Sequence, residues 1–137
     1  NHITTPSQEG MQQVMVASLE DACLKPQDID YINAHATATQ MGDIVESHAT
    51  FNVFGGDTPI SSTKGHMGHL LGGCGVVESI VCLIALNKSL LPKTMNFKIK
   101  VISLRFTSEM GTKLLTKVNR MRHSCILRVS QSYSEIP

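Results

Sequence analysis

Hydrophobic residues near the start of the chain recur at the spacing of a helix, and a short strand-like run follows. From about Gln8 to Leu24, the apolar positions share one side of a helix: Met11, Val14, Met15, Ala17, Leu19 and Ala22. This spacing predicts a helix with one buried face. Lys25-Pro26 ends it, because proline disfavours helical backbone at the residue before it. The run IDYINA (residues 29–34) then predicts a short strand, which leads into the polar loop HATATQMGD.

A second helix and strand follow, and then a long apolar segment. Asp43 is placed to cap a helix over about residues 44–54. Residues 58–62 predict another short strand, and a glycine-rich loop leads into a predicted helix from about Gly68 to Asn87. That helix is apolar nearly all round, so we expect it to be buried on several sides. Its glycines lower the helix propensity, and we expect them to allow the helix backbone to pack closely against a neighbouring segment.

The order of these elements predicts an α/β fold, with a βαβα core and a long buried helix. Both loops that carry histidines follow a predicted strand, and sites in such sheets collect at the carboxyl ends of strands. Beyond Asn96 the pattern is weaker. Residues 101–106 fit a strand and residues 110–122 a basic helix, while residues 123–137 show no clear period.

Charge divides the 137 residues into two parts. Residues 1–97 hold four Lys or Arg against nine Asp or Glu, a net −5, whereas residues 98–137 hold eight against two, a net +6. The change predicts one domain over residues 1–97 and a divergent basic tail over residues 98–137. The tail has two aromatic residues and no recognised reader motif, so we expect no nucleic-acid partner.

Cysteine and hydropathy patterns bear on the compartment. The cysteines have neither CxxC zinc spacing nor the density of a secreted disulfide framework, so we expect reduced intracellular thiols: Cys23, Cys74, Cys82 and Cys125. No segment reaches the roughly 20 apolar residues of a membrane span, and the first residues do not show the basic–apolar–small pattern of a signal peptide. Because the sequence begins without Met, in NHITTPSQEG, we expect it to be the middle of a longer protein.

The stretch SSTKGHMGHLLGGCG, residues 61–75, raises three chemical alternatives. A phosphate-binding P-loop needs its lysine after the glycines, and Lys64 precedes them. Zinc needs three or four converging ligands, and His66 with His69 supplies a weak pair without an HExxH motif, so we expect no metal. Acyl transfer fits better, because His35 and His69 both follow strands. Two neutral imidazoles there can donate hydrogen bonds to one carbonyl oxygen and stabilise an enolate.

The surroundings of His69 and four further residues support acyl-transfer chemistry. We expect His69 at the start of the buried helix, where the helix dipole favours the neutral ring. A buried Lys64 needs a partner, and Glu78 on that helix can supply one. The hydroxyls of Thr37 and Thr39 can donate to a polar substrate arm.

At this point a family resemblance appears. The segments NAHATATQMGD…E, SSTKGHMGHLLGGCGVVE and LLPKTMNF resemble the C-terminal half of the β-ketoacyl-acyl-carrier-protein synthases, over about His2 to Phe97. The segment YINAHAT is most similar to the corresponding segment of the mitochondrial and bacterial type II enzymes. The resemblance implies a thiolase-like layered fold and no cofactor. It also implies a homodimer in the full-length enzyme and a mitochondrial or cytoplasmic location.

The resemblance also implies a reaction and a role for each site residue. The reaction is the decarboxylative Claisen condensation of an acyl thioester with malonyl-carrier protein in fatty-acid elongation. His35 and His69 would bind the malonyl thioester carbonyl, and Lys64 would pair with Glu78 and set the electrostatics. Thr37 and Thr39 would contact the phosphopantetheine arm of the acyl carrier protein.

The sequence departs from the family at two points. None of its cysteines has the family's nucleophile context, and we interpret Cys74 and Cys82 as small core residues. Residues 98–137 lack the family's Gly-Phe-Gly-Gly segment, so we expect a tail of other origin, such as an altered reading frame. We therefore expect the isolated chain to be inactive and to aggregate through uncovered faces. The alternatives are a non-catalytic remnant, a partner-binding piece, or a thiolase-like acyltransferase.

Overall fold

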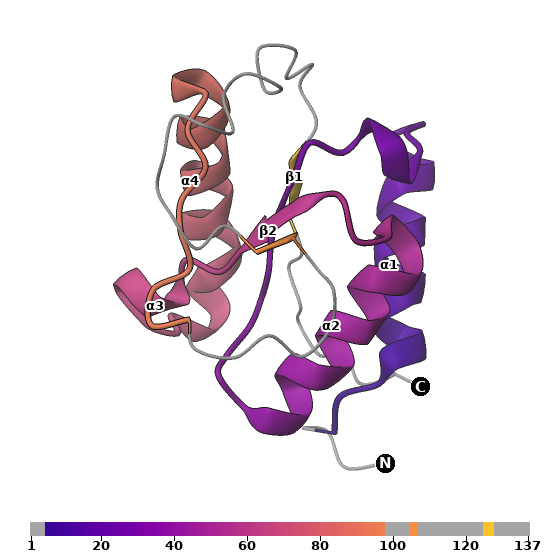
Figure 1. The fold of residues 1–137 in the computed structure, drawn as a ribbon, viewed down its shortest axis with the longest axis horizontal. Coiled ribbons are helices and arrows are strands. Elements are labelled where there is room, and N and C mark those ends of the chain that lie inside the picture. The colour runs from indigo at the N-terminus through magenta and orange to yellow at the C-terminus, as the bar shows by residue number, and fades with distance from the viewer. Residues whose placement is uncertain (1–4, 98–104, 107–124, 128–137) are drawn as a thin grey trace.

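A four-stranded parallel sheet carries helices on both of its faces (Figure 1). The structure is a computed structural model that describes residues 5–97, 105–106 and 125–127. The strands lie in the order β3-β2-β1-β4. Their bounds are Tyr31–Asn33 for β1, Pro59–Ser61 for β2, Arg105–Phe106 for β3 and Cys125–Leu127 for β4.

Helices α1 and α2 pack against each other on one face of the sheet (Figure 1). Helix α1 spans Gln8–Asp21, and the Ser7 side chain caps it by accepting the Gly10 N–H at 3.1 Å. It ends three residues before the predicted Leu24. Met15 and Leu19 are buried as the period predicts, but Val14 is exposed, because α1 packs against α2 along one face only. A short 3-10 turn η1 (Pro26–Asp28) leads into β1.

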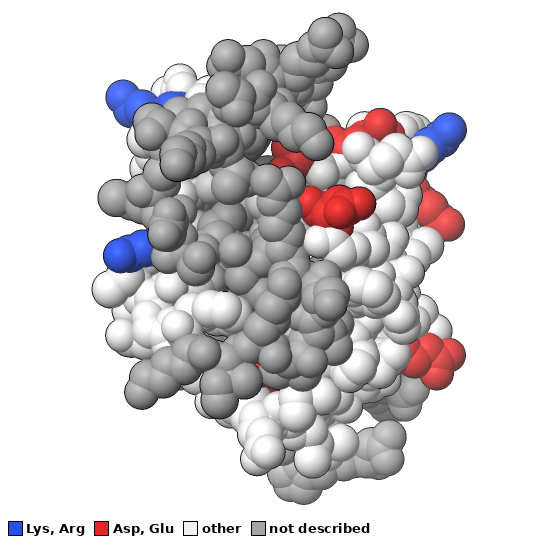
Figure 2. Space-filling view, viewed as in Figure 1, with Lys and Arg blue, Asp and Glu red and all other residues white. Residues whose placement is uncertain are grey.

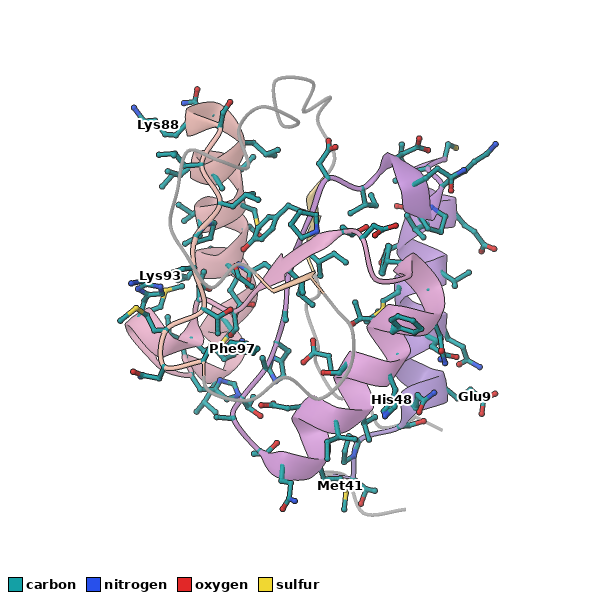
Figure 3. All side chains as sticks on the ribbon, in the orientation of Figure 1. Glu9, Met41, His48, Lys88, Lys93 and Phe97 are labelled. Atoms are coloured by element: carbon teal, nitrogen blue, oxygen red, sulfur yellow. The ribbon has the colours of Figure 1, made fainter. Side chains whose placement is uncertain are left out.

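Helix α2 spans Gln40–Phe54 and begins one turn earlier than the sequence predicts. The N-cap position is Thr39, whose carbonyl accepts the Asp43 N–H at 2.9 Å. The prediction that Asp43 caps this helix is therefore wrong, since Asp43 lies in the first turn. Figure 3 shows Met41 and His48 projecting from α2 away from the sheet, and both are exposed.

The main hydrophobic core lies between these two helices and the sheet. Strand residues Ile32 and Ile60 face each other across the β1–β2 pair and are 3% and 2% exposed. They join a buried cluster formed with Met15, Leu19, Ile29, Ala34, Ala49 and Phe54. Because side chains alternate along a strand, the neighbouring residues point to the opposite face of the sheet.

That opposite face is polar, and it faces α4. The Tyr31 and Ser61 hydroxyls lie 2.6 Å apart, and the Asn33 amide donates to the Thr63 hydroxyl at 3.4 Å. These side chains are fully or almost fully buried. Within the described residues, the Asn33 side-chain oxygen is buried without a hydrogen-bond partner, so this polar layer is only partly satisfied and favours a functional site over a second hydrophobic core on this face.

Two helices and a 3-10 turn occupy the α4 side: α3 spans Lys64–Met67, η2 spans Leu71–Gly73 and α4 spans Cys74–Lys88. The predicted helix start at Gly68 is wrong. Gly68 has φ +76°, a backbone conformation that ends α3 and that favours glycine. An added Cβ at Gly68 or Gly72 would meet nothing within 4 Å, so close packing does not explain these glycines. Close packing is found at Gly65 instead, because a Cβ added there would lie 2.8 Å from the Met95 side chain.

Helix α4 buries one face only in this chain. Its buried residues recur at helical spacing, as Cys74, Glu78, Cys82 and Ala85. Val76, Ile80, Leu83 and Ile84 are between 50% and 67% exposed. The expected burial on several sides is therefore wrong for this chain taken alone, while the expected uncovered apolar face is present.

The described residues also contain one helical segment apolar enough to cross a membrane by length and composition. It is Leu71–Lys88, with mean hydropathy 1.5 over 18 residues, and 22% of it is buried. Sequence counting predicts no segment of this kind. Core helices of soluble domains pass the same test, and the charged Glu78 in its middle forms a buried ion pair with another helix.

Most of residues 98–137 lies outside the described residues, including the predicted helix over 110–122 and residues 101–104 of the predicted strand. Strand β3 covers the last two residues of that prediction, Arg105–Phe106, and β4 lies where no period is visible. Both pair with the sheet through their backbones. The division of the chain at residue 97 stays a prediction.

Acidic side chains gather on the side of α1 and α2 (Figure 2). Glu9, Glu20 and Asp21 of α1 are all exposed there. This surface accounts for part of the negative balance of residues 1–97, and it lies on the far side of the core from the polar layer.

Candidate active site

The loop after β1 is held by a buried carboxylate on α2. The His35 and Ala36 N–H groups donate to the two oxygens of Glu46, each at 2.8 Å. Glu46 is 5% exposed, so these charge-assisted bonds form away from water. The loop backbone is strained, with φ +30° at Ala36 and +63° at Ala38. Glu46 thus fixes the backbone from which the His35 ring projects.

The loop after β2 places Lys64 beneath the site. Lys64 is the first residue of α3, and its ammonium pairs with the Glu78 carboxylate of α4. The two side chains are 6% and 3% exposed, so this is a buried ion pair. The Ser62 hydroxyl accepts the Lys64 N–H at 3.3 Å. The predicted Lys64–Glu78 partnership is therefore present in the structure.

His69 lies in the loop between α3 and η2, not at a helix start as the sequence predicts. Its Nδ1 lies 3.0 Å from the Leu71 N–H and 3.1 Å from the Cys74 sulfur. A backbone N–H can only donate, so Nδ1 is the accepting nitrogen and the ring proton sits on Nε2. The hydrogen-bond network thus assigns a neutral ring with an Nε2–H donor.

The structure brings the two histidines together. The rings of His35 and His69 are perpendicular, with centroids 5.2 Å apart. Because β1 and β2 are neighbouring parallel strands, the loops that follow them meet at the same sheet edge. Two imidazoles at this separation can reach a single small atom placed beside them.

A cavity of about 460 Å³ opens at this sheet edge, and His69 lines it, whereas His35 is not among its lining residues although its neighbours Ala34 and Ala36 are. Its walls include both histidine loops, α2, and the segment from Thr94 to Phe97. Phe97 lies between α3 and α2 in Figure 3. The polar residues on its wall are Thr37, Asp43, Glu46, Ser47, Ser62, Lys64, His69, Thr94 and Asn96. The volume is of the size that holds one small ligand or a substrate arm.

The two threonines differ in their relation to this cavity. Thr37 is on its wall, and the Thr37 and Thr39 hydroxyls lie 3.1 Å apart. Thr39 also contacts α2, since a Cβ added at Gly42 would lie 2.4 Å from its hydroxyl. Thr37 is thus placed to meet a ligand, and Thr39 is placed to orient Thr37.

Asp43 is an acidic wall residue that the sequence pattern marks only as a cap. Burial raises the pKa of its carboxyl above the ordinary 3.8, and the nearby Glu46 raises that pKa further. Hydrogen bonds from the Ala38 and Thr39 backbone act in the opposite direction. The cavity therefore disfavours a second negative charge close to Glu46.

Sequence reasoning missed the segment that closes one wall. The Thr94 hydroxyl accepts the Ser62 N–H at 3.1 Å, and the His66 ring meets the Lys93 carbonyl at 2.9 Å. Met95 fills the space that glycine leaves at position 65. The quoted motif LLPKTMNF contains these residues, but its spacing gives no sign of contact with the lysine loop. The sequence likewise shows Glu46 only as the last residue of the motif NAHATATQMGD…E and does not predict its hydrogen bonds to the His35 loop.

No group of three or more potential metal ligands occurs among the residues that the structure describes. Cys23, Cys74 and Cys82 are free thiols, of which Cys74 and Cys82 are buried. The expected role of Cys82 as a small core residue agrees with its 2% exposure. Cys74 is buried too, but its sulfur contacts the ring of His69.

Comparison with known proteins decides the family. The sequence model of the β-ketoacyl synthase C-terminal domain matches residues 1–98. This chain belongs to that family. The ketosynthase resemblance drawn from the two histidine motifs is confirmed.

Individual ketosynthases agree with this assignment. The mitochondrial 3-oxoacyl-[acyl-carrier-protein] synthase of Arabidopsis thaliana is 44% identical over 105 residues, which are 72% of this chain and 23% of that protein. The crystal structure of a β-ketoacyl synthase from Burkholderia phymatum STM815 has a TM-score of 0.72 at 36% identity, covering 80% of this chain and 27% of that one.

A third ketosynthase, in the AntDE:AntF structure, is similar in fold. It is described as a type II PKS acyl-carrier protein in complex with its ketosynthase bound to the hexaketide. Its TM-score is 0.71 at 29% identity, over 77% of this chain and 28% of that one. These ketosynthases confirm the expected thiolase-like α/β fold. The chain spans about a quarter of the length of the relatives it matches.

Proposed function

We propose that this chain supplies the malonyl-decarboxylating part of a 3-oxoacyl-acyl-carrier-protein synthase active site. The observation that carries the proposal is the perpendicular pair of His35 and His69 beside a cavity at the sheet edge. Family membership and the 44% identity to a mitochondrial synthase support this reaction class. The proposal covers the malonyl half-reaction, because no cysteine of the sequence has the family's nucleophile context.

The two histidines hold one oxygen in this mechanism. The His69 Nε2–H and the His35 ring donate to the thioester carbonyl of the malonyl group. The bond between the carboxylate carbon and the α-carbon breaks, carbon dioxide leaves, and the electron pair moves into the thioester enolate. Negative charge then develops on the oxygen that the rings hold, so their hydrogen bonds strengthen as the reaction proceeds.

Lys64 and Glu78 set the electrostatic background. The ion pair is buried, and Lys64 lines the same cavity as His69, so a positive charge lies near the sheet edge without being exposed to solvent. We assign Lys64 to this electrostatic role and Glu78 to holding its ammonium in place.

A polar substrate arm fits the threonine side of the cavity. Thr37 is on the wall and presents a hydroxyl that Thr39 orients. We propose that these hydroxyls bind the amide groups of the phosphopantetheine arm of an acyl carrier protein. The AntDE:AntF complex, in which a carrier protein sits on its ketosynthase, supports a carrier-protein partner.

The remaining assignments follow the relatives. We propose malonyl and acyl thioesters as substrates, a homodimer as the assembled enzyme, and a mitochondrial or cytoplasmic location. The mitochondrial Arabidopsis synthase supports the first of these locations. The exposed apolar face of α4 supports action within a larger assembly rather than as an isolated unit.

A chimeric enzyme tests the proposal. Residues 1–97 replace the corresponding segment of the Arabidopsis mitochondrial synthase, and carbon dioxide release from malonyl-carrier protein is measured. The control is the same chimera carrying His35→Ala. We expect release well above the control. A folded chimera that releases carbon dioxide no faster than the control contradicts the proposal.

A further inference from the structure

Cys74 touches the proposed catalytic ring of His69. Its sulfur lies 3.1 Å from His69 Nδ1 and 3.1 Å from the Leu70 backbone nitrogen. Cys74 is 7% exposed, whereas His69 and Leu70 are exposed, so the buried sulfur supports a loop at the protein surface. It is the first residue of α4, and the η2 turn folds the chain back so that a residue five positions after His69 meets its ring.

Donors and acceptors around this sulfur can be assigned by elimination. The Leu70 N–H donates to the sulfur, and the Leu71 N–H donates to His69 Nδ1 at 3.0 Å. Nδ1 therefore carries no proton, and a thiolate–imidazolium pair would place a proton where Leu71 already donates. Because Nδ1 has a single lone pair, a neutral thiol whose S–H points at Nδ1 shares that lone pair with the Leu71 N–H in a three-centre hydrogen bond.

We propose that Cys74 is a positioning residue for His69. Its S–H donates to Nδ1 alongside the Leu71 N–H, and the Leu70 N–H fixes the thiol's orientation. Two donors on Nδ1 hold the proton on Nε2 and fix the ring angle against His35. Cys74 touches no substrate and acts only through His69. The proposal rests on the proposed function, which makes the Nε2–H the group that meets the substrate.

The thiol is chemically suited to this place. A sulfhydryl is a weak donor, so it aligns the ring without withdrawing much electron density from it. Its size fills the turn between η2 and α4, where the sulfur is buried. The interpretation of Cys74 as a filler of the core accounts for the burial, but not for the two polar contacts.

Nitrogen-15 NMR of the full chain labelled at its histidines tests the proposal. Four proteins are compared: the parent chain, Cys74→Ala, Cys74→Ser, and the control Cys82→Ala. Cys82 is also buried on α4, about 12 Å further along the helix axis. The measured quantities are the Nδ1 and Nε2 resonances of His69, and amide spectra report whether each variant folds.

We expect an unprotonated Nδ1 and a protonated Nε2 in the parent chain. Cys74→Ala should shift the Nδ1 resonance away from the position of a protonated nitrogen, because a donor is lost. Cys74→Ser should shift it the other way, since a hydroxyl is the stronger donor, and Cys82→Ala should leave it unchanged. The two opposite shifts allow either variant to decide if the other does not fold.

Two results overturn the proposal. One is a parent chain whose Nδ1 is protonated. The other is a His69 Nδ1 resonance that stays in place in the folded Cys74 variants. The measurement needs no turnover, so it is separate from the test of function. An active chimera with an insensitive Nδ1 resonance refutes the role of Cys74 alone, and an inactive chimera with the expected shifts refutes the function alone.

Discussion

The rings of His35 and His69 meet edge to face with centroids 5.2 Å apart, although the residues are 34 positions apart in the sequence. Their meeting follows from the pairing of β1 with β2, which brings the two loops to one sheet edge. Glu46 fixes the backbone of the first loop, and Leu71 with Cys74 fixes the ring on the second. The pair is therefore held from both sides.

The buried ion pair predicts a large effect of Glu78→Gln. Removal of the carboxylate leaves the Lys64 ammonium buried without its counter-charge, which should lower the free energy of unfolding by about 3–5 kcal/mol. Urea unfolding of the chain measures it, with Glu20→Gln on the exposed face of α1 as the control. The double variant Lys64→Met with Glu78→Leu should recover most of the loss. A Glu78→Gln variant as stable as the control contradicts the assignment.

Glu46→Gln tests the clamp on the His35 loop. A glutamine side chain has one accepting oxygen where two N–H groups need acceptors, so one charge-assisted hydrogen bond is lost. We expect a loss of about 2 kcal/mol in unfolding free energy and a shifted His35 ring resonance. Glu9→Gln, which alters an exposed carboxylate on α1, is the control. An unmoved His35 resonance would show that the clamp does not position the ring.

Asp43 predicts a stability that depends on pH. Its folded-state pKa is raised above 3.8 by burial and by Glu46, so the folded protein holds this proton more tightly than the unfolded chain. Its unfavourable contribution is therefore absent below about pH 4 and grows as the pH rises through the raised pKa. Asp43→Asn should stabilise the chain at neutral pH, and the gain should vanish in acid.

Urea unfolding from pH 3 to pH 8 (roughly the range over which carboxyl groups with raised pKa values titrate) measures this gain. Asp57→Asn, at an exposed carboxylate, is the matched control. A gain from Asp43→Asn that stays constant with pH would show that the amide acts through packing and not through charge.

Prediction from the sequence succeeded where local physics decides. The structure contains the strands predicted at 29–34 and 58–62 and the helix predicted near 8–24. The signals for them are the spacing of apolar residues and the chain-breaking effect of proline and glycine, and both act within a few residues. The Lys64–Glu78 pair was also predictable, since a buried lysine requires an acid. The family motifs located both histidines.

Prediction failed where contacts between distant segments decide. The start of α4 shifted from Gly68 to Cys74 because the loop folds back on His69, which no period reveals. The closure of the cavity by Thr94 and Met95 depends on a contact across the chain. The burial of α4 was overestimated. An apolar helix sequence predicts that its faces will be buried against other elements, but it does not show whether this chain supplies those elements.

That uncovered face gives a prediction of its own. The isolated chain should self-associate through α4, where Ile80 and Leu83 are 50% and 64% exposed. Substitution of both by lysine should yield a monomer by light scattering without loss of unfolding free energy. Ala85→Lys, at a buried position on the same helix, should unfold the chain. A parent chain that stays monomeric and melts cooperatively contradicts this prediction.

The most direct test of the account is the rate of malonyl decarboxylation in the chimera carrying His35→Ala, His69→Ala, or both. Each single variant should lose about 100- to 1,000-fold in rate, because one donor to the developing oxyanion is removed. The double variant should be little slower than either single one, since the two rings serve one oxygen and act as a unit. Full activity in either folded single variant, or losses that multiply in the double variant, would contradict the claim that His35 and His69 hold the same carbonyl oxygen.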